Sequence, residues 1–212
     1  MQLAPILALV LALFTVFVAA QPPIPLASSV FALGDADAAI KLEAFVDLQC
    51  PDSKAVWPIL LQLAKHYGPH KLQLVATLFP LPYHHNAFFA AQARPPFPEL
   101  ARNNTVFWDY AQYLYDQQDN WGDEATQGIA PLQVITQMSR YAQACCKVDP
   151  AAFVKAMGWV SAQNLLARVT WKRAASLGIY GTPQFMINGV SSSADESWTM
   201  ADWRKLLDPL LL

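Results

Sequence analysis

Apolar residues recur along the chain with two different periods, and each period predicts a different kind of element. Residues 40–48 form an apolar, strand-like segment. Directly after it, apolar residues recur at spacings of four, three and four residues: Val56, Leu60, Leu63 and Tyr67. That spacing places them on one face of a helix. The pattern therefore predicts a strand over 40–48 and a helix over 53–67, which Gly68-Pro69 ends.

Strand character returns on either side of a long stretch that has none. Residues 71–79 alternate in part and are rich in Leu and Val, which predicts a second strand. Residues 184–187 predict a third, and Asn188-Gly189 favours a hairpin turn into a partner strand that starts at Val190. Residues 84–177 show no strand pattern. The helical segments between the strands are residues 86–93, 106–117, 132–144, 150–157 and 161–176.

Shorter elements stand at the two ends of this series. Residues 30–33 predict a short edge strand that Gly34-Asp35 ends, and residues 200–207 predict an amphipathic helix. The proline-rich residues 94–98 and the polar residues 116–127 are expected to be loops. The order is strand, helix, strand, a long helical stretch, a hairpin and a helix, with no internal repeat.

The N-terminus has the pattern of a secretory signal peptide. An apolar run over residues 6–20 is shorter than the roughly 20 residues that a membrane span needs. It closes on Val18-Ala19-Ala20, which offers small residues for a cut before Gln21. Residues 1–20 are therefore predicted to be a signal peptide. The alternative is an uncleaved signal anchor, which the absence of Lys or Arg before the run supports.

The charge balance bears on the partners of the chain, and the signal peptide indicates its compartment. A net charge of −2 gives no support for binding to nucleic acid or to an anionic membrane. We expect a monomer that is secreted or stays in the lumen of the secretory pathway, with no membrane contact after signal cleavage. Asn103-Asn104-Thr105 is a glycosylation sequon at Asn103 that fits this route, although such tripeptides also occur unused.

The candidate chemistry centres on Cys50-Pro51-Asp52-Ser53, between the first long strand and the first helix. A cysteine at such a junction faces unpaired backbone N–H groups and the positive end of the helix dipole, which favour the thiolate. Asp52 opposes this effect with a negative charge beside the sulfur. Ser53 stands where a Cys-x-x-Cys site has its second thiol, so the usual intramolecular release from a mixed disulfide is absent.

Two prolines accompany this cysteine. Pro58 lies inside the helical pattern that follows Cys50, where it is expected to kink the helix. Pro183, in Gly181-Thr182-Pro183, lies in a turn that leads into the hairpin. A proline in such a turn is a candidate for a cis peptide bond.

Together these motifs resemble the thioredoxin superfamily, and within it the secreted DsbA-like disulfide oxidoreductases, which carry a helical insertion. Residues 45–51 look like the strand and nucleophile of that group. Residues 78–87 look like the entry of its second central strand into the insertion. Residues 178–183, with Asn188-Gly189, look like its cis-proline loop and hairpin. The resemblance covers residues 28–208. The chain departs from the family at the second cysteine, where it has Ser53.

The resemblance implies an α/β, thioredoxin-like fold with an inserted all-helical subdomain. The first part of the thioredoxin-like domain would be residues 21–83, the helical insertion residues 84–177, and the second part residues 178–212.

The resemblance also implies roles for single residues. Cys50 is the nucleophile, Ser53 could hydrogen-bond its sulfur, and Pro51, Thr182 and Pro183 contact bound substrate. We expect a monothiol disulfide oxidoreductase or isomerase that acts on disulfide- or thiol-bearing proteins or peptides. It would need no cofactor, with glutathione as a co-substrate that could release a mixed disulfide.

Two other functions remain open. One is a redox-inactive carrier of peptides or proteins. In that case the fold has been kept after the catalytic activity was lost, and Cys50 is only a small packed residue. The other is a glutathione-dependent transferase, because related folds with this insertion bind glutathione and use a serine at the position of Cys50. The retained cysteine counts against the transferase.

The other two cysteines are neighbours, Cys145-Cys146, in the helical stretch. Three cysteines leave at least one unpaired. A disulfide between neighbours needs a strained ring and is uncommon. We expect instead that one of the two is buried as an ordinary hydrophobic residue, with a contact to Cys50 as the alternative. Neither is expected to be needed for the fold.

Histidine and aromatic residues do not suggest a second kind of site. His66 and His70 are four residues apart, but Gly68-Pro69 breaks the helix between them, so no metal site is expected. His84-His85, at a helix start, is expected to have a capping or surface role. The large aromatic residues of the helical segments are expected in the core: Trp57, Phe88, Phe89, Trp108, Trp159 and Trp171.

Overall fold

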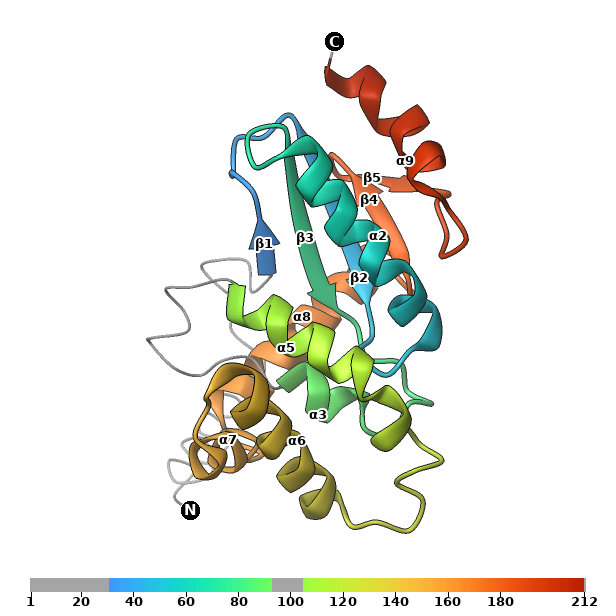
Figure 1. Cartoon of the computed structure of the whole chain (residues 1–212). Helices are drawn as coiled ribbons and strands as arrows, with labels where there is room; N and C mark the ends of the chain where they lie inside the picture. Colours follow the sequence, from blue (N-terminus) through green and yellow to red (C-terminus); the bar gives the residue numbers. More distant parts are fainter. Residues whose placement is uncertain (1–30, 93–104, 212) are drawn as a thin grey trace, which may run out of the picture.

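A five-stranded mixed sheet forms the centre of the protein, whose computed structural model describes residues 31–92 and 105–211 (Figure 1). The strand order is β1-β3-β2-β4-β5. Strands β2 and β3 are parallel, and the other neighbouring pairs are antiparallel. The strands are β1 (Phe31–Leu33), β2 (Ile40–Val46), β3 (Leu72–Leu78), β4 (Gln184–Ile187) and β5 (Val190–Ser192). The strands and the hairpin predicted from the sequence are confirmed, with β1 at one edge.

The helices fall into two groups. Helix α2 (Pro51–Tyr67) joins β2 to β3, and α9 (Met200–Leu207) with η2 (Asp208–Leu211) follows the hairpin. The remaining helices lie between β3 and β4: α3 (Ala87–Gln92), α5 (Thr105–Asp116), η1 (Gln118–Asn120), α6 (Pro131–Cys146), α7 (Pro150–Ala156) and α8 (Ala162–Ser176). Figure 1 shows them gathered at the end of the sheet where β2 and β3 finish. The α/β fold with an inserted helical subdomain is confirmed.

Helix α2 starts earlier than its apolar period suggested. Pro51 occupies its first turn, where a missing N–H costs no hydrogen bond, and Cys50 is the extended N-cap residue. The helix continues through Pro58 and ends at Gly68, whose φ of 73° suits glycine. Its predicted apolar face is buried: Val56, Leu60, Leu63 and Tyr67.

Apolar side chains cover the sheet on both faces. On one face, Trp57 of α2 is fully buried and stacks on Trp108 of α5. On the other face, a smaller cluster contains Phe45, Phe79 and Ala174, the last of these from α8. Because residues of the insert contribute to both clusters, the insert packs against both faces of the sheet. None of the helices in residues 31–92 and 105–211 is long and apolar enough to cross a membrane.

The expectation that the large aromatic residues are core residues is wrong for two of them. Trp57 and Trp108 are buried, but Trp159 is 76% exposed and Trp171 is 37% exposed. Trp159 lies in the turn between α7 and α8 and not in a helix, so the helical pattern did not apply to it.

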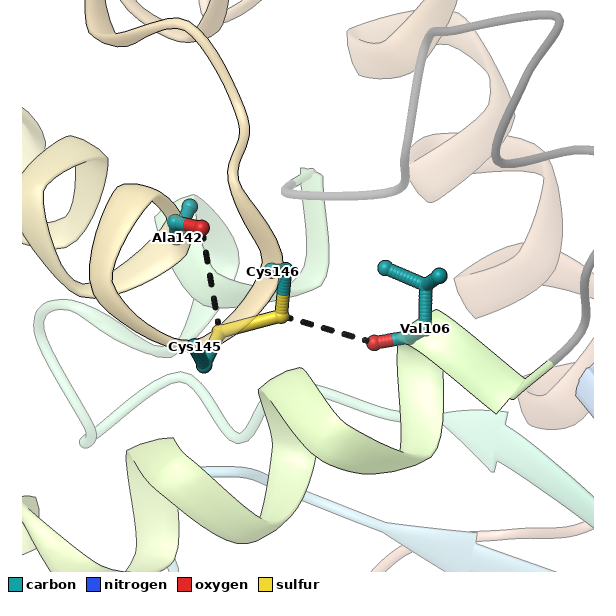
Figure 2. Close-up of a disulfide and its surroundings, with 4 residues drawn as sticks. All are labelled: Val106, Ala142, Cys145 and Cys146. Carbon is teal, nitrogen blue, oxygen red and sulfur yellow. Dashed lines mark hydrogen bonds between the residues drawn. A yellow bond between two sulfur atoms is a disulfide. The ribbon is translucent and has the colours of Figure 1, made fainter.

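The expectation that Cys145 or Cys146 is buried as an ordinary, unpaired hydrophobic residue is also wrong, because the two form a disulfide with each other (Figure 2). That neither is needed for the fold stays a prediction. They end helix α6, and Lys147 after them takes a left-handed conformation with a φ of 59°. The Cys146 sulfur lies 3.8 Å from the carbonyl oxygen of Val106, in the first turn of α5. The contact with Cys50 is excluded too: Cys50 lies beside Gln118, past the other end of α5, and α5 spans about 18 Å at 1.5 Å per residue.

Candidate active site

Cys50 lies at the edge of the sheet where β2 ends and α2 begins. Its backbone N–H donates to the carbonyl of Asp47, which forms a tight turn after the strand. The side chain is 4% exposed and is the free thiol of the chain. It donates a hydrogen bond to the backbone carbonyl of Thr182, with 3.3 Å between sulfur and oxygen. The Thr182–Pro183 peptide bond is cis, as predicted. The fold thus brings together Cys50, Thr182 and Pro183, which lie far apart in the sequence.

Ser53 lies one helical turn after Cys50, and no hydrogen bond found within residues 31–92 and 105–211 joins its hydroxyl to the Cys50 sulfur. The side chain is fully buried, and its hydroxyl accepts a hydrogen bond from the backbone N–H of Asp47 at 3.3 Å. The hydroxyl is therefore engaged with the end of β2, and the expected bond from Ser53 to the Cys50 sulfur is not found among the described residues. Pro51, also named as a site residue, is exposed beside Cys50. Asn103 lies outside the described residues.

A buried carboxylate, Asp47, lies directly behind the Cys50 turn. One of its oxygens accepts from the backbone N–H of Gln49 at 2.8 Å. The other accepts from the backbone N–H of Leu81 at 2.8 Å and lies 2.7 Å from Nδ1 of His84. The side chain of Asp47 has no exposed surface. Since its two oxygens bind residues of different segments, Asp47 connects the end of β2 to the segment that follows β3.

His84 is the partner of this carboxylate, so the expectation that it is a surface or capping residue is wrong. Its side chain is 16% exposed, whereas that of His85 is 79% exposed. The hydrogen bond with Asp47 raises the pKa of His84 above its ordinary value, and partial burial of the ring opposes this effect. The signal for the pair was a charged residue, Asp47, at the end of an apolar strand. Its partner could not be identified before the fold was known.

The helical insert also supports the Cys50 turn. The amide nitrogen of Gln118, in η1, donates to the carbonyls of Leu48 and Cys50 at 3.1 Å each. The amide oxygen of Gln49 accepts from the backbone N–H of Asn86, and its amide nitrogen donates to Asp123. Residues of the insert thus hydrogen-bond to Leu48, Gln49 and Cys50, the turn that carries the thiol. Sequence reasoning missed Gln118, because nothing in its neighbourhood marks it.

Replacing His84 with glutamine is expected to change the pH dependence of stability. Because the folded-state pKa of His84 is raised, the stability that its charge adds is fully present below the unfolded value of 6.5. It is lost as the pH rises through the folded-state pKa. Urea denaturation should therefore show a larger difference in free energy of unfolding between the wild type and His84→Gln at about pH 6 than at about pH 9.

The exposed neighbour provides the control for this measurement. His85→Gln makes the same substitution at a neighbouring position whose side chain is 79% exposed. A pH-independent difference for His84→Gln would mean that the charged pair with Asp47 does not form.

Within residues 31–92 and 105–211, no group of three His, Cys, Asp or Glu side chains is arranged to hold a metal ion.

Comparisons with known proteins agree with this geometry. The family described as thioredoxin has a sequence model that matches residues 28–209. Oxidised BdbD from Bacillus subtilis is 16% identical, with a TM-score of 0.67, and the match covers 90% of this chain and 96% of that one. DsbA from Chlamydia trachomatis is 13% identical, with a TM-score of 0.66 and coverage of 90% and 96%. Wolbachia pipientis α-DsbA1 is 18% identical, with a TM-score of 0.66 and coverage of 89% and 92%. At these identities the likeness to solved structures concerns the fold. No curated protein sequence matches the chain.

Proposed function

The chain belongs to the thioredoxin family, and on this premise we propose that it catalyses thiol–disulfide exchange through the single thiol of Cys50. The observation that carries the proposal is the position of that thiol. It is a free cysteine at the N-cap of α2, 3.3 Å from the carbonyl that precedes the cis-proline. The serine at the resolving position limits the chemistry to one thiol.

The exchange proceeds in two balanced steps. The Cys50 thiolate attacks one sulfur of a substrate disulfide, so a mixed disulfide forms and the other substrate sulfur leaves as a thiolate. A second thiol, from the substrate or from glutathione, then attacks the mixed disulfide and returns Cys50 as a thiolate. When both thiols belong to one substrate, there is no net oxidation, and the result is isomerisation. When the substrate disulfide joins a protein thiol to glutathione, the result is deglutathionylation of that protein.

Substrate contacts are proposed at Pro51, Thr182 and Pro183. Pro51 is exposed beside Cys50, and the carbonyl of Thr182 already contacts the sulfur. The hydroxyl of Thr182 is buried without a hydrogen-bond partner among the described residues. Because an unpaired buried hydroxyl is costly, a bound peptide that offers it a partner would gain affinity there.

The compartment is part of the proposal. We place the protein in the secretory pathway or outside the cell, with residues 1–20 removed and glycan on Asn103. The support comes from the apolar run before Gln21 and from the sequon, both of which lie outside the described residues.

A redox-inactive carrier of peptides is the second candidate. It is favoured by the low exposure of Cys50, 4%, and by the engagement of its thiol with Thr182, which both limit access to the sulfur. The two candidates differ in whether Cys50 forms covalent adducts.

The proposal is tested by trapping. Wild-type protein incubated with a labelled, disulfide-bearing peptide is expected to form a mixed disulfide that shifts its mobility in non-reducing electrophoresis. Cys50→Ala should form none, because it lacks the attacking sulfur. The double variant Cys145→Ala/Cys146→Ala should trap as much peptide as the wild type, since its lost disulfide lies at the far end of α5. Equal, negligible adducts in the wild type and Cys50→Ala would leave the carrier as the function.

A further inference from the structure

A pocket of about 430 Å³ opens beside the candidate active site, where β3 ends and α8 passes. Since β2 and β3 are parallel, their carboxyl ends meet at one edge of the sheet. Cys50 follows β2 at this edge, and Pro80, Leu81 and Pro82 of the pocket follow β3. The backbone N–H of Leu81 donates to Asp47, so the pocket wall and the Cys50 turn are directly connected.

The inner wall of the pocket is apolar and rigid. It is made of Leu81, Phe88, Trp171 and the flanking prolines. The indole N–H of Trp171 donates to the carbonyl of Pro80 at 3.1 Å. Its ring stacks on Phe79 with 5.4 Å between the ring centroids and 4° between the planes. Trp171 is thus fixed in place while 37% of its surface stays exposed, which is suited to contact with an apolar group of a ligand.

The rim of the pocket is cationic. Arg168 and Lys172 are four residues apart on α8, so they lie on the same face of that helix. Within the described part of the chain neither forms an ion pair; Arg168 lies 5.9 Å above the ring of Trp159. His84 lines the pocket as well, with its ring paired to the Asp47 carboxylate, so Arg168 and Lys172 carry the unpaired positive charge of the rim. His85 lies 3.9 Å from a carboxylate oxygen of Asp123.

We propose that this pocket binds an acidic segment of the polypeptide on which the protein acts, with an apolar or aromatic residue of that segment against Trp171. The inference rests on the proposed function, because it takes a disulfide-bearing polypeptide as the substrate. Charge complementarity selects the acidic side chains, which would pair with Arg168 and Lys172. The apolar wall favours a peptide over a small inorganic anion, since such an ion would leave that wall without a partner.

The test uses full-length protein and peptides that carry serine in place of cysteine, so that no covalent chemistry contributes. Fluorescence anisotropy is expected to show at least about tenfold tighter binding of a peptide rich in glutamate and phenylalanine than of its lysine counterpart. Arg168→Gln/Lys172→Gln should weaken binding of the acidic peptide about tenfold. The control pair, Arg140→Gln/Lys155→Gln, removes the same charge from exposed helix positions outside the pocket and should change binding less than about twofold.

Several outcomes would overturn the inference. They are equal affinity for the two peptides, equal loss in both double variants, and displacement of the peptide by inorganic phosphate at an ionic strength where chloride does not displace it. The last of these would assign the cations to a phosphate ion. Circular dichroism of both double variants verifies that they are folded.

The inference and the proposed function fail separately. If Cys50 traps no peptide but the acidic peptide binds wild type and not Arg168→Gln/Lys172→Gln, the pocket stands and the exchange chemistry falls. If Cys50 traps acidic and basic disulfide-bearing peptides at equal rates, the chemistry stands and the pocket falls.

Discussion

Ser53→Cys is expected to convert persistent mixed disulfides of Cys50 into transient ones. In the wild type, a trapped peptide waits for a thiol from solution. In the variant, a second thiol lies on the same helix one turn from Cys50, within the distance that a disulfide can span. Because the attack is then intramolecular, peptide release should be at least about a hundredfold faster than from the wild type. The measurement is the decay of the adduct in non-reducing electrophoresis after excess peptide is removed.

The structure adds a condition to this expectation. The hydroxyl of Ser53 faces the backbone N–H of Asp47, so a cysteine at this position must turn its sulfur away from Asp47 to reach Cys50. Cys50→Ala/Ser53→Cys is the matched control, because it carries the new thiol without the nucleophile and should not cycle. If Ser53→Cys held its adducts as long as the wild type does, positions 50 and 53 would not be aligned for dithiol exchange. If neither protein formed adducts, the oxidoreductase assignment would fall.

Asp47→Ala is expected to lower the free energy of unfolding by about 3–5 kcal/mol. The substitution leaves the buried backbone N–H groups of Gln49 and Leu81 without acceptors and His84 without its carboxylate. Each unsatisfied buried donor costs about 1–3 kcal/mol, and the lost charge adds to that sum. Urea denaturation followed by circular dichroism measures the change.

An exposed carboxylate provides the comparison. Asp37 is exposed and has no hydrogen bond or ion pair among the described contacts, so Asp37→Ala should stay within about 0.5 kcal/mol of the wild type. An Asp47→Ala protein less than about 1 kcal/mol below the wild type would show that water or rearranged side chains replace the carboxylate.

Much of the fold could be predicted because most of its helices and strands follow from patterns of apolar and turn residues that are close together in the sequence. The face of α2 repeats with the helical period, and Asn188-Gly189 marks the turn between β4 and β5. The thiol and the cis-proline were found in the same way, since Cys50 and Pro183 stand in recognisable local motifs. That the two motifs belong to one site followed from the family resemblance and from no property of either segment alone.

The features that could not be predicted depend on packing between distant segments or on details of a helix end. Asp47 and His84 meet only because β2 and β3 are neighbours, and their partnership has no local signal. The direction of Ser53 depends on how α2 is rotated against the sheet. The bond between Cys145 and Cys146 depends on the backbone where α6 ends, which its apolar period does not describe.

Gln118 makes the position of the nucleophile dependent on the helical insert. A single amide from the insert holds the two carbonyls on either side of the nucleophile turn, and one of these belongs to Cys50 itself. A segment that replaced the insert would need a donor in the same place to keep these two carbonyls hydrogen-bonded. Substitutions that move η1 would therefore shift the backbone that carries the thiol, although they change no residue of the Cys50 turn itself.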